Sequence, residues 1–422
     1  MLWFYVADRT PALAAGPKEY IRDVFLFIFL VLTLVAGSYS MKQGRAPVLI
    51  NRQQTEEWKG WMQVLFLLYH YYEAREAYNA IRIFIASYVW MTGYGNFSYY
   101  YKTRDFSLGR FCQMMWRLNF LAFFCCSTLD NEYMLYYICP MHTLFTVAVY
   151  AALGLWRSGN DSNWGVWVKI AGCFAVVVGM WEIPAVFYAA WRPLSFLLGY
   201  TDPRRPNPNA MHEWYFRTGL DKYIWIYGMI CAYLHPKFDA WMKSVDASGP
   251  GRRRAIRSVV GGASCVVFYL WYRHVYRLPK LEYNKLHPYT SWIPITAYLM
   301  LRNLTPTLRL HAMGLYGWLG CITLETYVAQ YHTWLLSKVP NSQPIYILSL
   351  LPGYPLLNFS AVTAIYIFVS HRLFELTSSL RDALIPHDDD AKLGRNLLTM
   401  VVGSGVLWGV GFLVKEGAKS LA

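Results

Sequence analysis

The chain has 422 residues, and 39 Lys and Arg against 25 Asp and Glu give it a net charge of +14. Hydrophobic residues make up 56% of it and charged residues 15%, compared with about 25% charged residues in soluble proteins. This balance excludes a disordered chain, a coiled coil and a collagen, and it argues against a set of soluble domains. The outer surface of such a chain is expected to face lipid.

Apolar runs follow one another along the chain, and the polar breaks between them are too short for a soluble domain. We therefore expect an all-α fold, a polytopic transmembrane helical bundle with 11–13 membrane segments. Residues 22–414 are expected to form one multi-pass transmembrane domain, between an N-terminal segment, 1–21, and a C-terminal tail, 415–422. The expected spans are 22–38, 58–74, 80–98, 110–128, 133–155, 164–190, 219–236, 258–275, 287–303, 312–336, 344–374 and 395–414. Pro352 and Pro355 predict that the 344–374 run divides into two short helices.

Loop charge predicts the orientation in the membrane. The segment 237–257 is the most basic loop, so the positive-inside rule places it in the cytosol. Counting the spans backward places 99–110 and the start of the second span, near Lys59, on the same side. The acidic residues Asp130 and Glu132 then lie on the opposite side.

Several kinds of site are not expected. The eight cysteines form no CxxC pair and no Cys/His metal spacing, so they are interpreted as apolar filler in helices, and no metal is expected. The basic excess is typical of cytosolic loops and an anionic ligand in a membrane protein, and no nucleic acid partner is expected.

The second span is the richest in polar residues. Lys59 and His70 are eleven positions apart, so they share one helix face and lie about 16 Å apart along it. A lysine at the cytosolic rim can hold phosphates, and an imidazole near the midplane can exchange protons. Glu73, three positions after His70, is expected to orient the ring. An interfacial lysine and a hydrogen-bonded interior histidine would explain the same pattern without a function.

A second span repeats this combination. Glu325 and His332 are seven positions apart in GWLGCITLETYVAQYHTWLL and again share a face. Titratable groups inside a membrane are costly, so two spans that each carry a carboxylate and a histidine indicate a functional site.

Weaker candidates are polar residues that interrupt or border a span. They are Arg82, Arg117, Asn119, His142, Glu182, His212 and Arg217. A lone histidine such as His142 is more often structural. Glu213, Arg217 and Asp221, spaced by four, predict a salt-bridged helix face that needs no function.

Seven segments resemble a known family. They are TEEWKGWMQVLFLLYHYY, YNAIRIFIASYVWMTGYGNFSYYY, DFSLGRFCQMMWRLNFLAFFCC, NEYMLYYICPMHTLFT, LHPYTSWIPIT, ITLETYVAQYHTWL and HRLFELT. Over residues 20–380 the chain resembles the plant and algal reduced-wall-acetylation proteins, which belong with the fungal capsule and animal sialic-acid O-acetyltransferases.

A more distant likeness is to bacterial membrane acyltransferases. Their first motif is Arg, ten residues, then His, and these positions hold Lys59 and His70 here. Lysine keeps the charge but loses bidentate phosphate binding. Their closing motif, ISxxLYLxHxxxL, is similar to ITLETYVAQYHTWL, with His332 at its histidine.

The resemblance implies a multi-pass protein of the Golgi membrane that uses cytosolic acetyl-CoA for lumenal O-acetylation of cell-wall polysaccharides. With the helix geometry it implies that His70 is catalytic, as general base or as transient acetyl carrier. Glu73 would hold the tautomer of His70, and His332 would assist from a facing helix. The donor phosphates would contact Lys59 and one or more of Arg82, Arg117 and Arg217. Asn119, His212 and Glu325 are assigned to the acceptor.

The expected partners are the lipid bilayer, acetyl-CoA, and a polysaccharide or a lumenal acetyltransferase as the acetyl acceptor; oligomerisation stays open. Animal relatives carry an N-terminal lumenal esterase-like domain that this chain lacks, so a separate partner is expected if that domain performs the final transfer.

The alternative is a transporter that moves acetyl-CoA or another anion without chemistry and feeds a separate lumenal acetyltransferase. Anion passage needs cations but no proton shuttle, so the two histidines distinguish the hypotheses. A third hypothesis, a scaffold for a lumenal enzyme, leaves the buried His and Glu residues unexplained.

Overall fold

The computed structural model describes the chain except for residues 11–14, 202–205, 339–341, 387–388 and 422. The described residues are helical nearly throughout, which confirms the all-α class. The helices of the first half are α1 (Leu2–Arg9), α2 (Arg22–Tyr39), α3 (Arg52–Tyr72), α4 (Tyr78–Thr103), α5 (Leu108–Leu129), α6 (Ile138–Gly154), α7 (Asn163–Trp181), α8 (Pro184–Trp191) and α9 (Ser195–Leu198). Those of the second half are α10 (His212–Leu220), α11 (Ile224–Ala247), α12 (Pro250–Trp271), α13 (Lys280–Thr290), α14 (Trp292–Arg302), α15 (Pro306–Leu310), α16 (Gly314–Cys321), α17 (Thr323–Thr333), α18 (Ile345–Leu348), α19 (Pro355–Leu384) and α20 (Asp390–Leu421).

Two small antiparallel strand pairs join segments that are far apart in the sequence. Strand β1 (Ala15–Pro17) pairs with β4 (Ser342–Pro344), and β2 (Met41–Gln43) pairs with β3 (His311–Met313). The registers place Ala15 opposite Pro344 and Met41 opposite Met313. The strands therefore fasten the first 43 residues to the final third of the chain.

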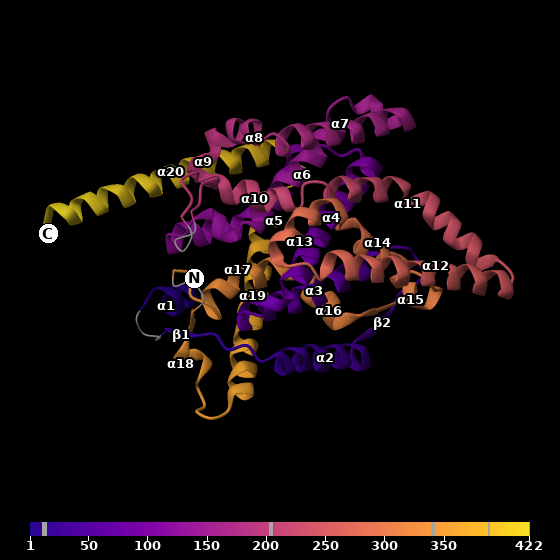
Figure 1. The fold of residues 1–422 in the computed structure, drawn as a ribbon. Helices are drawn as coiled ribbons and strands as arrows, with labels where there is room; N and C mark the ends of the chain where they lie inside the picture. The colour runs from indigo at the N-terminus through magenta and orange to yellow at the C-terminus, as the bar shows by residue number, and fades with distance from the viewer. Residues whose placement is uncertain (11–14, 202–205, 339–341, 387–388, 422) are drawn as a thin grey trace.

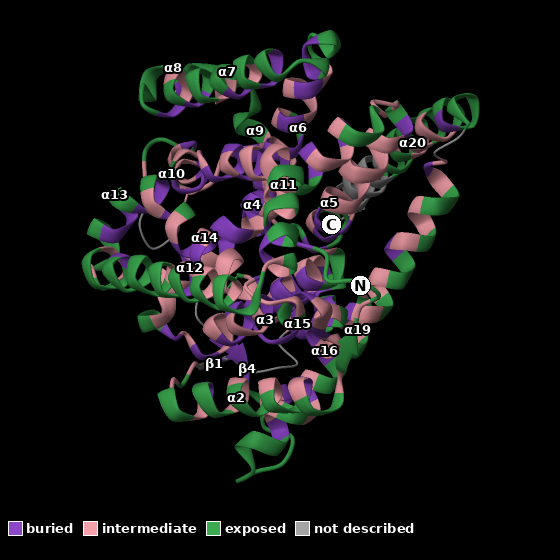
Figure 2. Ribbon diagram, turned by 90° about the vertical axis from the view of Figure 1, so that its right-hand side faces the viewer, coloured by how far each residue is buried: buried purple, intermediate pink, exposed green. Residues whose placement is uncertain are grey.

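Long apolar helices surround a more polar centre. Four described helices, at 22–39, 163–181, 250–276 and 355–384, are long and apolar enough to cross a membrane by length and composition. Figure 2 shows broad exposed surfaces on α2, α7 and α12, around buried stretches of α3 and α4. Helix α2 exposes Leu26, Phe27, Leu30 and Leu34, a surface that suits lipid better than water.

Several expected spans are divided in the structure. The 344–374 run divides at its prolines, as predicted, but into the four-residue α18 and the 30-residue α19 and not into two short helices. The 164–190 run, expected as one span, forms α7 and α8, with Pro184 as the first residue of α8. The 287–303 run forms α13 and α14, and the 312–336 run forms α16 and α17; no break was expected in these two.

The break between α16 and α17 lies at Ile322, in the core of the protein. A helix break leaves carbonyl groups without helical partners, which is costly away from water. Side chains from two other helices donate to carbonyl groups on either side of the break, and the one at Cys321 is an unpaired carbonyl at the end of α16. Gln63 Nε2 in α3 donates to the Thr323 carbonyl at 3.1 Å, and Arg117 Nη2 in α5 donates to the Cys321 carbonyl at 3.2 Å.

Glycines set the closest helix contacts. A Cβ at Gly93 in α4 would lie 2.0 Å from the Trp225 carbonyl oxygen of α11, and one at Gly228 would lie 2.3 Å from that of Trp90. Helices α3 and α16 meet in the same way at Gly60. Small residues let membrane helices approach at backbone distance.

Gly93→Ala is expected to destabilise the protein by about 1–3 kcal/mol, because the new methyl group forces α4 and α11 apart. The matched control is Gly95→Ala on the same helix, where an added Cβ meets nothing within 4 Å. Thermal unfolding of the purified protein in detergent measures both. Equal melting temperatures for the two variants would contradict this account of the packing.

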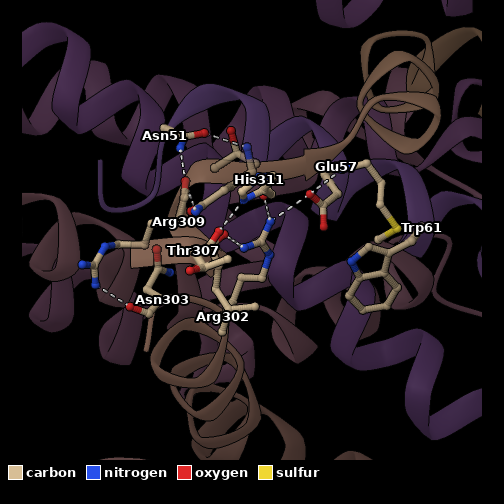
Figure 3. A network of polar contacts seen from close by, with 12 residues as sticks. Asn51, Glu57, Trp61, Arg302, Asn303, Thr307, Arg309 and His311 are labelled. Carbon is tan, nitrogen blue, oxygen red and sulfur yellow. Dashed lines mark hydrogen bonds and ion pairs between the residues drawn. The ribbon is translucent and has the colours of Figure 1, made fainter. Parts of the chain in front are cut away.

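A polar network ties the start of α3 to the basic end of the bundle (Figure 3). Arg302 Nη2 donates to Glu57 Oε2 at 2.9 Å. Arg309 pairs with Asp246, and the Arg309 carbonyl accepts a hydrogen bond from Asn51 Nδ2 at 3.1 Å. Asp246 belongs to the basic 237–257 segment. The network therefore places that segment and the start of α3 at one end of the protein, as the count of spans requires.

Candidate functional site

His332 in α17 is the centre of a hydrogen-bonded chain of three side chains. Its Nδ1 is 2.7 Å from Asp8 Oδ2, and its Nε2 is 2.6 Å from the Tyr136 hydroxyl. The side chains of Asp8 and His332 are fully buried. Because a carboxylate only accepts, Nδ1 carries the proton, and Nε2 accepts from Tyr136. Such a chain can take a proton from the tyrosine hydroxyl and hold the resulting imidazolium beside a carboxylate.

The short helix α1 delivers Asp8 to this chain. The backbone N–H and the hydroxyl of Ser337 each donate to Asp8 at 2.7 Å, which fixes both carboxylate oxygens. Trp3 Nε1 donates to Thr333 Oγ1 at 3.3 Å, and the Phe4 ring lies 5.2 Å from the His332 ring. The N-terminal segment thus packs on α17 and supplies a buried residue of the candidate site.

His70 lies on α3, two residues before the helix ends at Tyr72. Its ring packs between aromatic side chains, with ring centroids 4.5 Å from Phe66, 5.0 Å from Tyr69 and 6.4 Å from Tyr331. The sequence placed His70 half-way through the bilayer core, whereas the structure places it near the end of its helix.

Tyr331 connects the two histidines. Its ring lies 6.4 Å from the His70 ring and 5.9 Å from the ring of Tyr136, which is bonded to His332. Helix α17 packs on α3, so the structure brings both predicted histidines to one aromatic cluster. His70 Nδ1 and Gln330 Oε1 are both buried here, and the side chains of His70 and Gln330 interact with each other.

Glu73 does not have the helical position that the sequence predicted. Helix α3 ends at Tyr72, and Glu73 follows it in the left-handed conformation, with φ 55°. Its carboxylate pairs with Arg75 at 2.7 Å. The role of Glu73 in orienting His70 stays a prediction, and this pairing does not favour it.

Arg82 is buried and held by a carboxylate. Its Nη2 is 2.8 Å from Asp221 Oδ2, and His287 Nε2 lies 3.6 Å from the other oxygen of Asp221. The expected stripe of Glu213, Arg217 and Asp221 is therefore incomplete. Helix α10 ends at Leu220, and Asp221 turns to Arg82 instead of Arg217.

Arg117 and Glu325, which the sequence assigned to different ligands, pair with each other. Arg117 bonds both oxygens of the fully buried Glu325 carboxylate. Such bidentate contact largely neutralises both charges. The pair links α5 to the start of α17 and supports the break at Ile322.

Arg217 pairs with Glu213 at 3.0 Å, and its guanidinium lies 4.1 Å from the centre of the Tyr137 ring. It is within electrostatic reach of His70 and Tyr331. Of the three predicted arginines, Arg217 is the one whose charge acts on both His70 and Tyr331.

Asn119 and His212, which the sequence assigned to the acceptor together with Glu325, lie in different surroundings. Asn119 Nδ2 donates to the Met115 carbonyl at 3.0 Å and to Thr143 Oγ1 at 2.9 Å, and its oxygen accepts from Tyr133. These bonds hold Asn119 between α5 and α6. His212 is the half-buried first residue of α10.

Lys59 lies near the start of α3, and its Nζ is 2.7 Å from Glu56 Oε2. Its side chain lines a cleft of about 360 Å³ between α3, α4, α5, α6 and the start of α17. The cleft has the size of small-molecule sites, which span about 300–1,000 Å³.

Comparison with known proteins identifies the family to which the chain belongs. The model of the family described as "10 TM Acyl Transferase domain found in Cas1p" matches residues 1–398. The chain belongs to this family of membrane acyltransferase domains. The transmembrane helical fold is thereby confirmed, and the family description gives ten spans where the sequence predicted 11–13.

The N-acetylneuraminate (7)9-O-acetyltransferase of Danio rerio is 31% identical to the chain over 425 residues, which cover 96% of the chain and 51% of that relative. The chain spans about half the length of this curated relative. The match confirms the resemblance to the membrane O-acetyltransferases, but it does not confirm the plant and algal branch. No solved structure matches the chain.

For a membrane acyltransferase domain, the cluster offers two histidines, an oriented carboxylate and a nearby arginine. Sequence reasoning found both histidines and Arg217 but missed Asp8, Tyr136 and Tyr331. The available signal for Asp8 was an acidic residue in the apolar segment LWFYVADR, where Phe4 and Ala7 are buried in the structure. Tyr136 and Tyr331 could not be singled out from the sequence, because the chain has 34 tyrosines.

Proposed function

We propose that this protein is a membrane O-acetyltransferase that takes acetyl groups from acetyl-CoA at its basic, cytosolic end and supplies them on the lumenal side. The observation that carries the proposal is the buried chain of Asp8, His332 and Tyr136 beside His70. A scaffold or an anion pathway has no need of an oriented, proton-accepting histidine.

In this mechanism His70 acts in one of two ways. As transient carrier it receives the acetyl group when the C–S bond of the donor breaks and CoA leaves as the thiolate; the acceptor hydroxyl then takes the acetyl group and gives its proton to the Tyr136 oxygen, while Tyr136 passes its own proton to His332, whose imidazolium Asp8 stabilises. As general base His70 itself takes the proton of the acceptor hydroxyl, and the CoA thiolate is again the leaving group. Arg217 stabilises the negative charge that develops on the carbonyl oxygen during transfer.

The acceptor is proposed to be a carbohydrate hydroxyl, on a cell-wall polysaccharide in the Golgi lumen, or a lumenal acetyltransferase that completes the transfer. The Danio rerio relative is named for O-acetylation of N-acetylneuraminate. That name supports a sugar hydroxyl as the final acceptor.

The test uses the purified protein in sealed liposomes, with acetyl-labelled acetyl-CoA outside. We expect free CoA to stay outside while labelled acetyl groups reach an acceptor inside. His70→Ala is expected to lower this rate by about 10²- to 10⁴-fold, the usual contribution of a general base. The control is His274→Ala, an exposed histidine away from the cluster.

Entry of intact acetyl-CoA at the same rate in wild type and in His70→Ala would identify a transporter and overturn the proposal. Unchanged transfer in His70→Ala would remove His70 from the mechanism.

A further inference from the structure

The cleft beside Lys59 contains polar groups that the proposed mechanism does not use. One face of α4 forms its wall, with Tyr88, Thr92, Asn96 and Tyr99 at helical spacing. None of the described side chains that line it is acidic. The cleft is therefore suited to a ligand that carries negative charge.

Two cations line the cleft, and one of them, Lys59, pairs with Glu56 at 2.7 Å, a contact that an anionic ligand would share or displace. Lys59 and Arg110 both occupy the early turns of their helices, α3 and α5, and Tyr99 lies near the end of α4. The Arg110 guanidinium lies 4.3 Å from the centre of the Tyr99 ring. Its Nε is buried and has no hydrogen-bond partner in the part of the chain that the structure describes. A buried guanidinium N–H without an acceptor is costly, so a bound anion would stabilise it.

His142 lines the cleft farther in. Its Nδ1 is 2.7 Å from Thr92 Oγ1, and that hydroxyl also donates to the Tyr88 carbonyl at 3.1 Å. A hydroxyl has one proton, so Thr92 must accept from His142, and Nδ1 carries the imidazole proton. The lone pair then lies on Nε2, the polar atom of the ring that remains for a ligand. Thr92 is seven residues before Tyr99 on α4, so His142 lies about 10 Å farther along α4 than Arg110, which lies over Tyr99.

Phe66 and Tyr327 form the wall between this cleft and the histidine cluster. Both line the cleft, and their rings are 6.0 Å apart. On the other side, the Phe66 ring contacts that of His70 at 4.5 Å, and Tyr327 contacts Tyr331 at 5.6 Å. A group bound at the inner end of the cleft is therefore one layer of aromatic rings away from His70.

We propose that this cleft is the donor site, which binds the phosphopantetheine arm of an acyl-CoA with its phosphates at Lys59 and Arg110 and its thioester at Nε2 of His142. The inference rests on the proposed function for the identity of the donor. It assigns Arg110 and His142, which the sequence did not select as ligand-binding residues, and it makes His142 a catalytic residue. Its Nε2 attacks the thioester carbonyl, the C–S bond breaks and CoA leaves as the thiolate, and the acetyl group then passes the layer of Phe66 and Tyr327 to His70.

Binding is tested first, with the full-length protein in lipid nanodiscs and desulfo-CoA as an unreactive probe. Lys59→Ala and Arg110→Gln are each expected to weaken binding by about 10- to 100-fold, the effect of losing one charged hydrogen bond. Gly95→Trp is expected to abolish binding, because Gly95 lines the cleft and an added side chain meets open space there. The matched control is Gly172→Trp on the exposed face of α7, where nothing lies within 4 Å of an added Cβ.

Transfer is tested next. His142→Ala is expected to keep desulfo-CoA binding within about threefold and to lower acetyl transfer by about 10²- to 10⁴-fold. Thr92→Val, which removes the acceptor for Nδ1–H, is expected to lower transfer and leave binding unchanged.

The outcomes separate the two proposals. Normal desulfo-CoA binding in Gly95→Trp and Arg110→Gln, with transfer intact in the wild type, would overturn the cleft assignment and leave the proposed function standing. Full transfer in His142→Ala would remove the catalytic role of His142. Binding in the cleft by a wild-type protein that transfers no acetyl group would support the site and contradict the proposed function.

Discussion

Asp8→Asn is expected to lower acetyl transfer by about 10²- to 10⁴-fold while the protein stays folded. The asparagine can still accept from the backbone N–H of Ser337, so the local packing is kept. Its NH2 group, however, faces His332 Nδ1 in place of the carboxylate oxygen and favours the tautomer with the proton on Nε2. In that tautomer His332 cannot accept from Tyr136, and the imidazolium loses its carboxylate. The measurement is the initial rate with acetyl-labelled acetyl-CoA in liposomes.

Two further readouts separate this effect from simple loss of structure. The KM for acetyl-CoA is expected to stay near its wild-type value while kcat falls, because Asp8 does not contact the donor. Asp8→Glu, which restores a carboxylate, is expected to recover part of the rate. An Asp8→Asn protein with full activity would show that the chain of Asp8, His332 and Tyr136 has no part in catalysis.

Asp221→Ala is expected to destabilise the folded protein by about 3–5 kcal/mol. The substitution leaves the Arg82 guanidinium, 5% exposed, without its partner in the protein interior. Removing one member of a buried ion pair costs more than the pair contributes, because the remaining charge is neither solvated nor paired. Thermal and denaturant unfolding of the purified variant in detergent measure the loss.

The double variant Arg82→Met with Asp221→Leu provides the control, since apolar side chains of similar volume replace both charges. It is expected to recover most of the stability and to bind desulfo-CoA with wild-type affinity. Loss of that affinity would mean that Arg82 contacts the donor, as the sequence predicted. Wild-type stability in Asp221→Ala would contradict the structural role assigned to the pair.

The positions of the helices could be read from the sequence because apolar runs of membrane length leave few alternatives. The division between α18 and α19 was predicted from Pro352 and Pro355, whereas the division at Pro184, which begins α8, was not expected within the 164–190 span. The break at Ile322 could not be predicted in this way. It is stabilised by Gln63 and Arg117, which belong to helices far away in the sequence.

The candidate site was predicted only in part, for a similar reason. His70 and His332 were found because a histidine in an apolar run is costly wherever the run packs. The partners of charged residues depend on tertiary contacts, so Arg117 and Glu325 were assigned to two ligands although they pair across 208 residues. His142 was interpreted as structural, and only its place in the cleft and its bond to Thr92 suggest a function.

The pairing of Asp8 with His332 has a consequence for biogenesis. The two residues are separated by 324 positions. Strand β1 likewise pairs with β4, which follows it much later in the sequence. Synthesis runs from the N-terminus, so α1 has no α17 to pack on until more than 300 further residues have been made. During that time Asp8 is a charged residue without its histidine. A nascent chain that has not reached α17 therefore lacks the partner of Asp8, and the proposed relay forms only when α1 and α17 meet.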